Sequence, residues 1–257
     1  MAVLDGRVAV LTGGGRGIGR ALAEAFAAAG AAVVVSARTT AEIDAVAAGI
    51  DAAGGRCIAV TADAMHRESA REPVRAAMAA FGRCDILVNN VGGTVGSGPL
   101  PYAPDDASFE DTVVLNLTTA YWTTSEALPH MRERGFGRVI NVGSGAARHA
   151  SGSIAYTSAK HGLIGLTKQL ALATATHGIT VNCLCPGWTN TSLVDFGRIG
   201  ERNGVSADIA RQRAEADSAQ RRVLEPDELA PMAVLLASEA GSGITGQVIN
   251  VDGGYRL

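Results

Sequence analysis

The sequence predicts an α/β protein with one doubly wound parallel sheet of seven strands and helices on both of its faces. Short runs rich in Val, Ile and Leu alternate with longer Ala-rich segments of helical period from residue 7 onward. This alternation is typical of repeated βαβ units, because two parallel strands need a crossover connection between them. Neither a linker nor a break in composition divides the chain, so residues 1–257 are expected to form a single domain.

The predicted strands are apolar and β-branched, and several end in clusters of Gly, Asn or Pro that favour turns. They span residues 7–11, 32–36, 56–61, 84–88, 137–142, 179–184 and 247–251. Helical segments lie between them, among them 20–29, a long stretch over 105–134, a helix that bears Tyr156 and runs to about 176, and 226–237. Residues 192–222 are helical in pattern but highly charged, which predicts a mobile insert over the substrate site rather than a core element.

The composition is that of an ordinary globular protein. Hydrophobic residues make up 47%, charged residues 18%, and the formal net charge is -3, so no basic excess indicates a nucleic-acid partner. Apolar runs near the start are far shorter than a membrane span, and Asp5 and Arg7 interrupt the place of a secretory signal. The four cysteines form no Cys-x-x-Cys pair and are expected to be reduced core thiols. We therefore expect a cytoplasmic protein without a metal site or a membrane partner.

A glycine-rich turn joins the first predicted strand to the first helix. Such a turn lets backbone N–H groups and the positive helix end approach a pyrophosphate, which side chains would block. The spacing here is Gly13-x-x-x-Gly17-x-Gly19, without the strict G-x-G-x-x-G string, and a tight turn without a ligand is the alternative. An Asn-Asn-x-Gly cluster after the fourth strand favours a Rossmann-type dinucleotide site. The residues expected to line it are Gly13, Gly15, Arg16, Gly17, Ile18, Gly19, Asn90 and Gly92.

The end of the second strand is expected to select between the two nicotinamide dinucleotides. An acidic residue there would hold a ribose 2′-hydroxyl, whereas a basic residue would hold a 2′-phosphate. The sequence has Ala37 and Arg38 at this end, with no carboxylate, and Arg16 can reach the same phosphate from the glycine turn. This predicts NADP(H), with NAD(H) as the alternative if Arg38 is only a solvated residue. Asp63 could accept from the adenine amino group or cap the next helix.

Tyr156 and Lys160 are four residues apart in a predicted helix, which places them on one helical face. A tyrosine hydroxyl is a poor acid or base at neutral pH, and a nearby cation favours its phenolate form. Such a pair also arises by chance on solvated helices. Its meaning therefore depends on Ser144 at the end of the fifth strand and on Asn116 in the preceding long helix.

The order and spacing of these motifs resemble the short-chain dehydrogenase/reductase family along essentially the whole chain. The matching positions are Thr12 to Gly19, Asn89 to Gly92, Asn116, Ser144, Tyr156, Lys160, Pro186-Gly187 and Val251 to Gly254. The resemblance implies that Ser144 hydrogen-bonds a substrate carbonyl and that Tyr156 exchanges its proton as general acid and base. It further implies that Lys160 holds the nicotinamide ribose and favours the phenolate, and that Asn116 holds a water joining Lys160 to solvent.

The same resemblance assigns the nicotinamide amide to the segment after the sixth strand, at Pro186, Gly187, Thr189 and Thr191. It also implies a homotetramer, assembled through the two long helices. Where the commonest family form has alanine after the paired asparagines, this chain has Val91. Both residues are small and apolar, so we expect no loss of function.

Substrate contacts are expected from the loops at the carboxyl ends of the strands. The candidates are Thr94, Arg148, Trp188, Leu193 and Phe196. The runs at 159–162 and 185–188 resemble 3-hydroxybutyrate dehydrogenases and polyketide ketoreductases. The loops offer no cationic clamp for a small carboxylate at Thr94, Ala146 or Ser153, which favours a neutral or bulky ketone.

The sequence thus predicts an NADP(H)-dependent oxidoreductase that transfers a hydride between nicotinamide and a ketone or secondary alcohol. One alternative is an NAD-dependent dehydrogenase of a hydroxy acid, similar to 3-hydroxybutyrate, or of a cyclic alcohol or diol. Alternatives from other classes are a non-redox lyase and a cofactor-binding protein without turnover on the same fold. The complete set of Ser, Tyr, Lys and Asn argues against the last of these.

Overall fold

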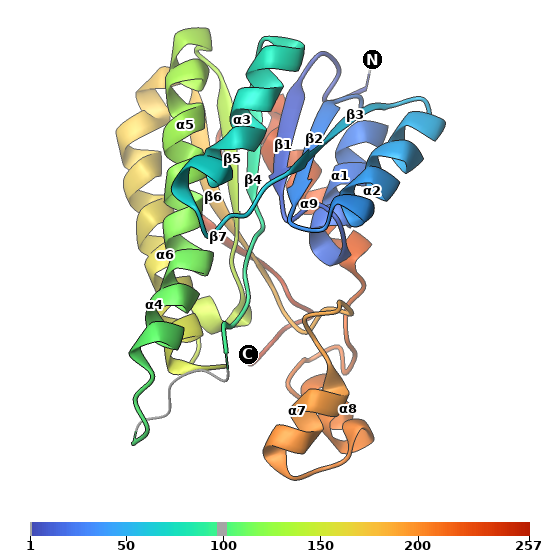
Figure 1. Ribbon diagram of the computed structural model, residues 1–257, viewed down its shortest axis with the longest axis vertical. Helices are drawn as coiled ribbons and strands as arrows, with labels where there is room; N and C mark the ends of the chain where they lie inside the picture. Colours follow the sequence, from blue (N-terminus) through green and yellow to red (C-terminus); the bar gives the residue numbers. More distant parts are fainter. Residues whose placement is uncertain (1, 97–101) are drawn as a thin grey trace.

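Seven parallel strands form the sheet of the computed structural model, in the order β3-β2-β1-β4-β5-β6-β7 (Figure 1). The structure describes residues 2–96 and 102–257. The strands are β1 (Val8–Thr12), β2 (Ala32–Ala37), β3 (Arg56–Thr61), β4 (Ile86–Asn89), β5 (Gly137–Val142), β6 (Ile179–Pro186) and β7 (Val248–Val251). The predicted doubly wound α/β fold is confirmed.

Helices cover the sheet on both faces. They are α1 (Gly17–Ala28), α2 (Thr40–Ala52), α3 (Arg67–Phe81), α4 (Asp106–Val113), α5 (Thr119–Arg134), α6 (Ile154–Thr174), α7 (Phe196–Asn203), α8 (Ala207–Ala216) and α9 (Ala230–Ala237). One core cluster joins α1, α2 and α9 to one face, and a second joins α3, α5 and α6 to the other. Alternate residues of β1 show the division, since Leu11 belongs to the first cluster and Val10 to the second. A strand buried on both faces is apolar throughout, which explains the continuous runs in the sequence.

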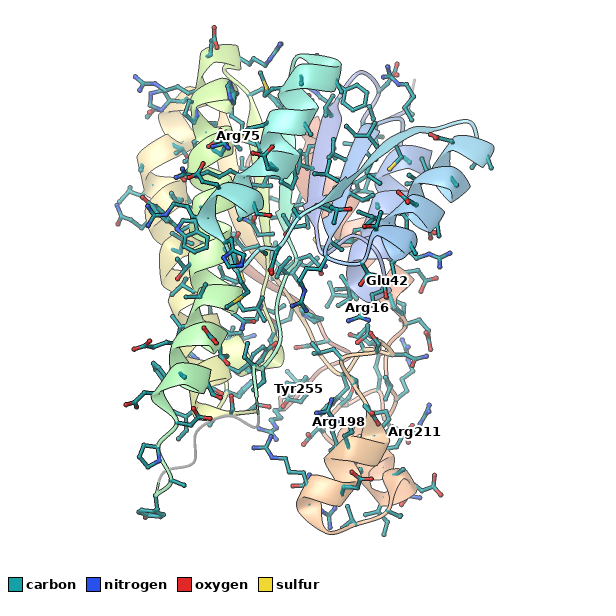
Figure 2. The ribbon with its side chains drawn as sticks, in the orientation of Figure 1. Arg16, Glu42, Arg75, Arg198, Arg211 and Tyr255 are labelled. Carbon is teal, nitrogen blue, oxygen red and sulfur yellow. The ribbon has the colours of Figure 1, made fainter. Side chains whose placement is uncertain are left out.

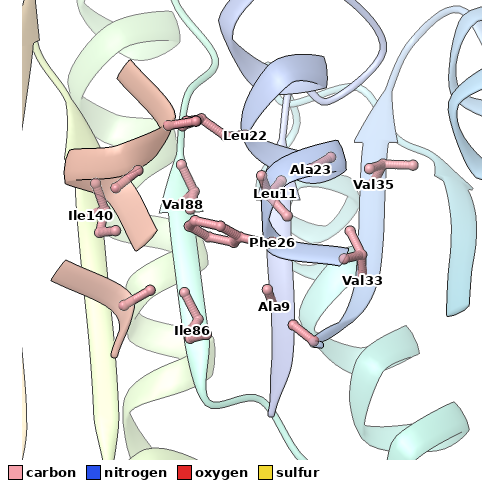
Figure 3. Close-up of a cluster of buried hydrophobic side chains, with 14 of the residues drawn as sticks. Ala9, Leu11, Leu22, Ala23, Phe26, Val33, Val35, Ile86, Val88 and Ile140 are labelled. Carbon is pink, nitrogen blue, oxygen red and sulfur yellow. The ribbon is translucent and has the colours of Figure 1, made fainter. Parts of the chain in front are cut away.

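The first core cluster centres on Phe26 of α1, which lies over β1 and β4 beside Leu11 and Val88 (Figure 3). Phe26 is fully buried, and burial of such a side chain contributes about 1.5–3 kcal/mol. This packing fixes α1 against β1, so both ends of the glycine turn that joins them are fixed in place.

The long helical stretch predicted over 105–134 is interrupted once. Between α4 and α5 the chain forms a π-helical segment, Val114–Thr118, which contains Asn116. A π-helical turn shifts the hydrogen-bond pattern by one residue and is frequent at functional sites. The sequence pattern carries no signal for this shift.

Residues 192–222, here called the α7–α8 insert, project beyond the carboxyl ends of the strands (Figure 1). Its base is closed by two hydrogen bonds, from Leu224 N to Trp188 O at 2.9 Å and from Asn190 N to Leu224 O at 2.8 Å. A second attachment joins it to the C-terminal segment, where Arg256 N donates to Asp217 O at 2.8 Å. Across the described ranges, no helix has both the length and the apolar character needed to cross a bilayer.

Candidate active site

The end of β5 and the start of α6 bring the predicted catalytic residues together. Ser144 directly follows β5, and its Oγ accepts from Ala146 N at 3.1 Å. The hydroxyl of Ser153 caps α6 by accepting from Tyr156 N at 3.2 Å, which fixes where the helix begins. One turn later, Lys160 Nζ lies 5.6 Å from the centre of the Tyr156 ring. The expected spacing along one helical face is therefore present.

Lys160 is a buried cation, with only 3% of its surface exposed. Its Nζ donates to Val142 O, the last carbonyl of β5, at 2.8 Å. A Cβ at Gly92 would come within 3.1 Å of Nζ and 2.7 Å of Asn116 Oδ1. The ammonium group, the asparagine and the β4 turn thus meet at a point where only glycine fits.

Asn116 is 1% exposed and binds the turn after β4. Its Nδ2 donates to Gly93 O at 2.7 Å and to Thr112 O at 2.8 Å, and its Oδ1 accepts from Gly93 N at 3.0 Å. Both amide protons are therefore used, while one acceptor position on Oδ1 remains. The side chain fixes the backbone beside Lys160.

A cavity of about 340 Å³ opens above this cluster. Its lining includes thirteen of the residues predicted from the sequence: Ile18, Asn90, Gly92, Thr94, Ser144, Tyr156, Lys160, Pro186, Gly187, Trp188, Thr189, Thr191 and Leu193. Catalytic candidates and most of the expected nicotinamide and substrate contacts therefore share one space.

The glycine turn has the shape expected for a pyrophosphate. Gly17 has a φ of 52°, and a Cβ at Gly19 would overlap the Gly13 carbonyl oxygen. Asn90 Nδ2 holds the turn by donating to Gly13 O at 3.0 Å and to Thr12 O at 3.2 Å. Among the described residues, no side chain caps α1 and no acid lies in its first turn. The helix end keeps N–H groups for an anion, so these residues fit a dinucleotide.

The segment after β6 lies over the glycine turn. A Cβ at Gly187 would come within 2.7 Å of Asp252 O, so glycine is required for its approach to the residues after β7. Thr189 is buried and donates from Oγ1 to Gly187 O at 3.1 Å. The methyl group of Thr191 packs against Gly17, 3.1 Å from where its Cβ would be. The predicted nicotinamide and pyrophosphate residues are thus neighbours.

The predicted binding site for the 2′-phosphate contains a carboxylate that was not expected from the sequence. Arg16 and Arg38 are both exposed, but Arg16 Nη1 lies 3.3 Å from Glu42 Oε1. Glu42 comes from the first turn of α2 rather than from the end of β2, so the residues at the strand end give no sign of it. Asp63 Oδ1 accepts from Met65 N at 3.0 Å, within the turn that leads into α3.

The substrate side differs from the expectation in three residues. Arg148 is exposed and lies outside the cavity lining, and Phe196 packs behind Trp188 with 6.3 Å between ring centres. Tyr255 instead lines the cavity, 5% exposed, with its hydroxyl 3.2 Å from Ser151 Oγ (Figure 2). A C-terminal residue carries no local motif, so only the tertiary fold identifies it. Residues 97–101, which include the end of the predicted substrate loop 93–100, lie outside the described residues.

Two buried thiols support the strand that carries Ser144. The sulfurs of Cys183 and Cys185 lie 3.7 Å apart, and a Cβ at Gly143 would come within 2.8 Å and 2.5 Å of them respectively. Their mutual hydrogen bond raises the pKa of Cys183 and lowers the pKa of Cys185, and the Lys160 charge acts against the first shift and with the second. Gly143 is required here because β6 presses these sulfurs against the end of β5.

The chain is similar to known proteins along most of its length. A family model described as short chain dehydrogenase matches residues 7–201. The chain is 37% identical over 254 residues to the short-chain reductase protein NovJ of Streptomyces niveus, covering 99% of this chain and 95% of that protein. It is 36% identical over 260 residues to the D-beta-hydroxybutyrate dehydrogenase of Cupriavidus necator, covering 98% and 99%.

A solved structure from Beutenbergia cavernae, described as a candidate NAD(P)-dependent gluconate 5-dehydrogenase with NADP bound at low occupancy, superposes with a TM-score of 0.88. It is 33% identical and covers 97% of this chain and 96% of that one. Together with the glycine turn and the shared cavity, these similarities show that the chain belongs to the short-chain dehydrogenase/reductase family and is an oxidoreductase that uses a nicotinamide cofactor.

Proposed function

We propose that the protein interconverts a ketone and its secondary alcohol with NADP(H), and that Tyr156 is the general acid and base. One observation carries the proposal: Ser144 and Tyr156 line the same cavity, and the buried Lys160 ammonium lies one helical turn from Tyr156. Nicotinamide supplies or accepts the hydride when it is bound. The chain's own residues provide the proton and the stabilisation of charge on oxygen.

Ser144 and Tyr156 would both donate hydrogen bonds to the carbonyl oxygen as negative charge develops on it. Donors that are already positioned contribute most at this stage, because they need no reorganisation. Tyr156 would then transfer its proton to that oxygen and take it back in the oxidation direction. General acid–base catalysis of this kind typically contributes about 10²–10⁴ in rate.

Lys160 would hold the nicotinamide ribose with the N–H groups of its ammonium that remain free. One N–H is used on Val142 O, which leaves two donors. Asn116 would hold a water between Lys160 and solvent at the acceptor position left on Oδ1. The proximity of Oδ1 and Nζ around Gly92 supports that role.

The cavity favours a neutral ketone of moderate size. Trp188 and Leu193 supply apolar walls, and Lys160 is the sole cation among the described lining residues. The similarity to a D-beta-hydroxybutyrate dehydrogenase supports a small hydroxy acid as the second candidate. That substrate needs a cation for its carboxylate, and a shift of the loop that carries Arg148 would be required to provide one.

Two further expectations are proposals of the same kind. The α7–α8 insert would close over the bound substrate, since Leu193, Val194 and Ile199 of this segment line the cavity. The chain would form a homotetramer through α5 and α6. Exposed apolar side chains on these helices, Tyr121 and Leu172, support that contact surface.

The test is to mix the protein with NADPH or NADH and a panel of neutral ketones and keto acids, and to follow absorbance of the reduced nicotinamide. We expect turnover of neutral ketones with NADPH preferred. Cofactor binding without turnover across the panel would instead indicate a sensor, and product formation without net oxidation or reduction would indicate a lyase. Preference for keto acids would select the second candidate.

A further inference from the structure

Glu42 lies over the glycine turn at the end of the proposed site that would receive the adenosine ribose. Its Oε1 is 3.3 Å from Arg16 Nη1 (Figure 2). A Cβ at Gly15 would lie 2.9 Å from Glu42 Cβ and 3.2 Å from Oε2. The aliphatic part of the Glu42 side chain therefore packs on the glycine turn, and its carboxylate lies over Gly15. The Glu42 side chain is 33% exposed, against 67% for Arg16.

The neighbouring strand ends enclose the same place. Gly14 N donates to Ser36 O at 3.0 Å, which joins the glycine turn to the end of β2. Arg38 follows that strand, is exposed, and makes no ion pair with a described residue. The charged groups at this point are thus the guanidinium groups of Arg16 and Arg38 and the carboxylate of Glu42, which is paired with Arg16.

A phosphate group and a hydroxyl group make opposite demands on this arrangement. A 2′-phosphate carries between one and two negative charges, is favoured by paired arginines and is repelled by a nearby carboxylate. An unphosphorylated ribose offers a 2′-hydroxyl that can donate to a carboxylate. Glu42 therefore opposes the first ligand by its charge and by occupying Arg16, and it can bind the second.

We infer that Glu42 is a specificity-determining residue, whose carboxylate competes with the 2′-phosphate for Arg16 and so reduces the preference for NADP(H) over NAD(H). The inference rests on the proposed function, because it places the adenosine ribose beside Arg16 and Arg38. It predicts that the unmodified protein accepts both dinucleotides. Removing the Glu42 charge should make it more selective for the phosphorylated one.

The direct test uses adenosine 2′,5′-bisphosphate and adenosine 5′-monophosphate as probes, with affinities measured by titration calorimetry. These two molecules differ only at the 2′ position, and neither requires turnover. Glu42→Gln should strengthen binding of the bisphosphate about fivefold, which is the range of an exposed charge pair, and should leave the monophosphate equal or weaker. The ratio of kcat/KM for NADPH over NADH should rise by the same factor.

Glu24→Gln is the matched control. Glu24 accepts from Arg20 Nε at 2.8 Å on the outer side of α1, so its loss removes a similar exposed ion pair away from the glycine turn. It should change neither affinity. In an Arg16→Gln background, Glu42→Gln should have much less effect, because the group that is competed for is gone.

Unchanged or weakened bisphosphate binding in Glu42→Gln, while the unmodified protein binds both probes, would overturn the inference and leave the proposed function standing. Weakened binding would show that Glu42 positions Arg16 for the phosphate. Failure of the unmodified protein to bind either probe would instead remove the proposed dinucleotide site, and the inference with it. Melting curves of each variant identify any loss of folding.

Discussion

The floor of the cavity and the α7–α8 insert above it are built in different ways. On the floor, Lys160 and Asn116 are almost fully buried and bonded to backbone groups of β5 and of the turn after β4. In the insert, α7 and α8 pack mainly on each other, and most of their residues are exposed. Buried polar groups are costly to leave unpaired, whereas exposed ones exchange protein partners for water.

The difference indicates a division of labour. Groups that handle protons must keep one geometry, which the floor provides through short hydrogen bonds from rigid strands and α6. Groups that recognise the rest of a substrate lie on a segment attached at its base, where changes have little effect on the sheet. Substitutions on the floor should therefore affect activity and stability more strongly than substitutions in or beside the insert.

The largest effect is expected on the floor, from Tyr156→Phe. Loss of the hydroxyl removes the proposed proton donor, so kcat/KM should fall by about 10²–10⁴. Cofactor affinity, measured by fluorescence titration, should stay nearly constant. Tyr102→Phe, at a fully exposed position ahead of α4, is the control and should retain activity. Turnover retained in Tyr156→Phe together with weakened cofactor binding would contradict the assigned role.

Asn116→Ala and Asn203→Ala compare two side-chain amides of the two regions. Asn116 makes three backbone hydrogen bonds in a buried site, so its loss should lower the free energy of unfolding by about 1–3 kcal/mol and reduce activity. Asn203 donates from Nδ2 to Ile199 O at 2.7 Å at the exposed end of α7, and its loss should cost less than about 0.5 kcal/mol. Denaturant unfolding measures both. Equal losses in the free energy of unfolding would show that the buried amide contributes no more to stability than the exposed one.

Trp188→Ala acts where the two regions join. The indole lines the cavity, and its Nε1 donates to Asp217 Oδ2 at 3.2 Å. Its loss removes apolar contact with the substrate and one attachment of the insert, so KM should rise about tenfold with a smaller change in kcat. Trp188→Phe keeps an aromatic ring but loses the N–H donor, so its KM should lie between those of the unmodified protein and of Trp188→Ala. A fall in kcat at constant KM would place Trp188 in the chemistry instead.

The smallest effect is expected at the foot of the insert, where Arg222 Nη1 and Nη2 donate to the two carboxylate oxygens of Glu228 at 2.6 Å. This pairing, with a hydrogen bond from Glu225 N, lowers the pKa of Glu228 from 4.5 to about 2. The folded-state pKa is depressed, so the pair stabilises the protein above pH 4.5 and loses that contribution as the pH falls toward 2.

Thermal unfolding of Glu228→Gln between neutral and acid pH measures this contribution. The variant should be slightly less stable at neutral pH, and the difference should disappear in acid. Arg222 is exposed and Glu228 is partly exposed, so screening by solvent keeps the effect small. A difference that stays constant with pH would mean that the charge of Glu228 does not contribute.

The sequence predicts the fold well because its signal is repeated: the strands are apolar runs, and several of them end in a turn cluster. The grouping of Ser144, Tyr156 and Lys160 follows from local spacing along one strand end and one helix. Residues brought in by tertiary packing could not be found in this way. Glu42 reaches the glycine turn only through the placement of α2, and Tyr255 reaches the cavity only because the C-terminal segment crosses back beneath the insert.

The π-helical turn at Asn116 and the outward position of Arg148 likewise could not be predicted from the sequence. The first depends on a hydrogen-bond shift of one residue, which neither composition nor periodicity encodes. The second depends on the path of the loop between β5 and α6, where most residues are small and give no pattern that fixes the direction of the Arg148 side chain. Sequence patterns locate the chemistry, whereas the pairing of charges around it requires the folded chain.

The hydrogen bonds that Leu224 makes with Trp188 and Asn190 have a consequence for how this protein could change. They hold the two ends of the α7–α8 insert together, whatever the length of the chain between them. The insert is therefore a loop that is closed at its base. Long insertions into closed surface loops add little entropic cost. The insert can therefore be lengthened, shortened or exchanged as a unit, and substrate range can diversify while the proton-transfer apparatus stays intact.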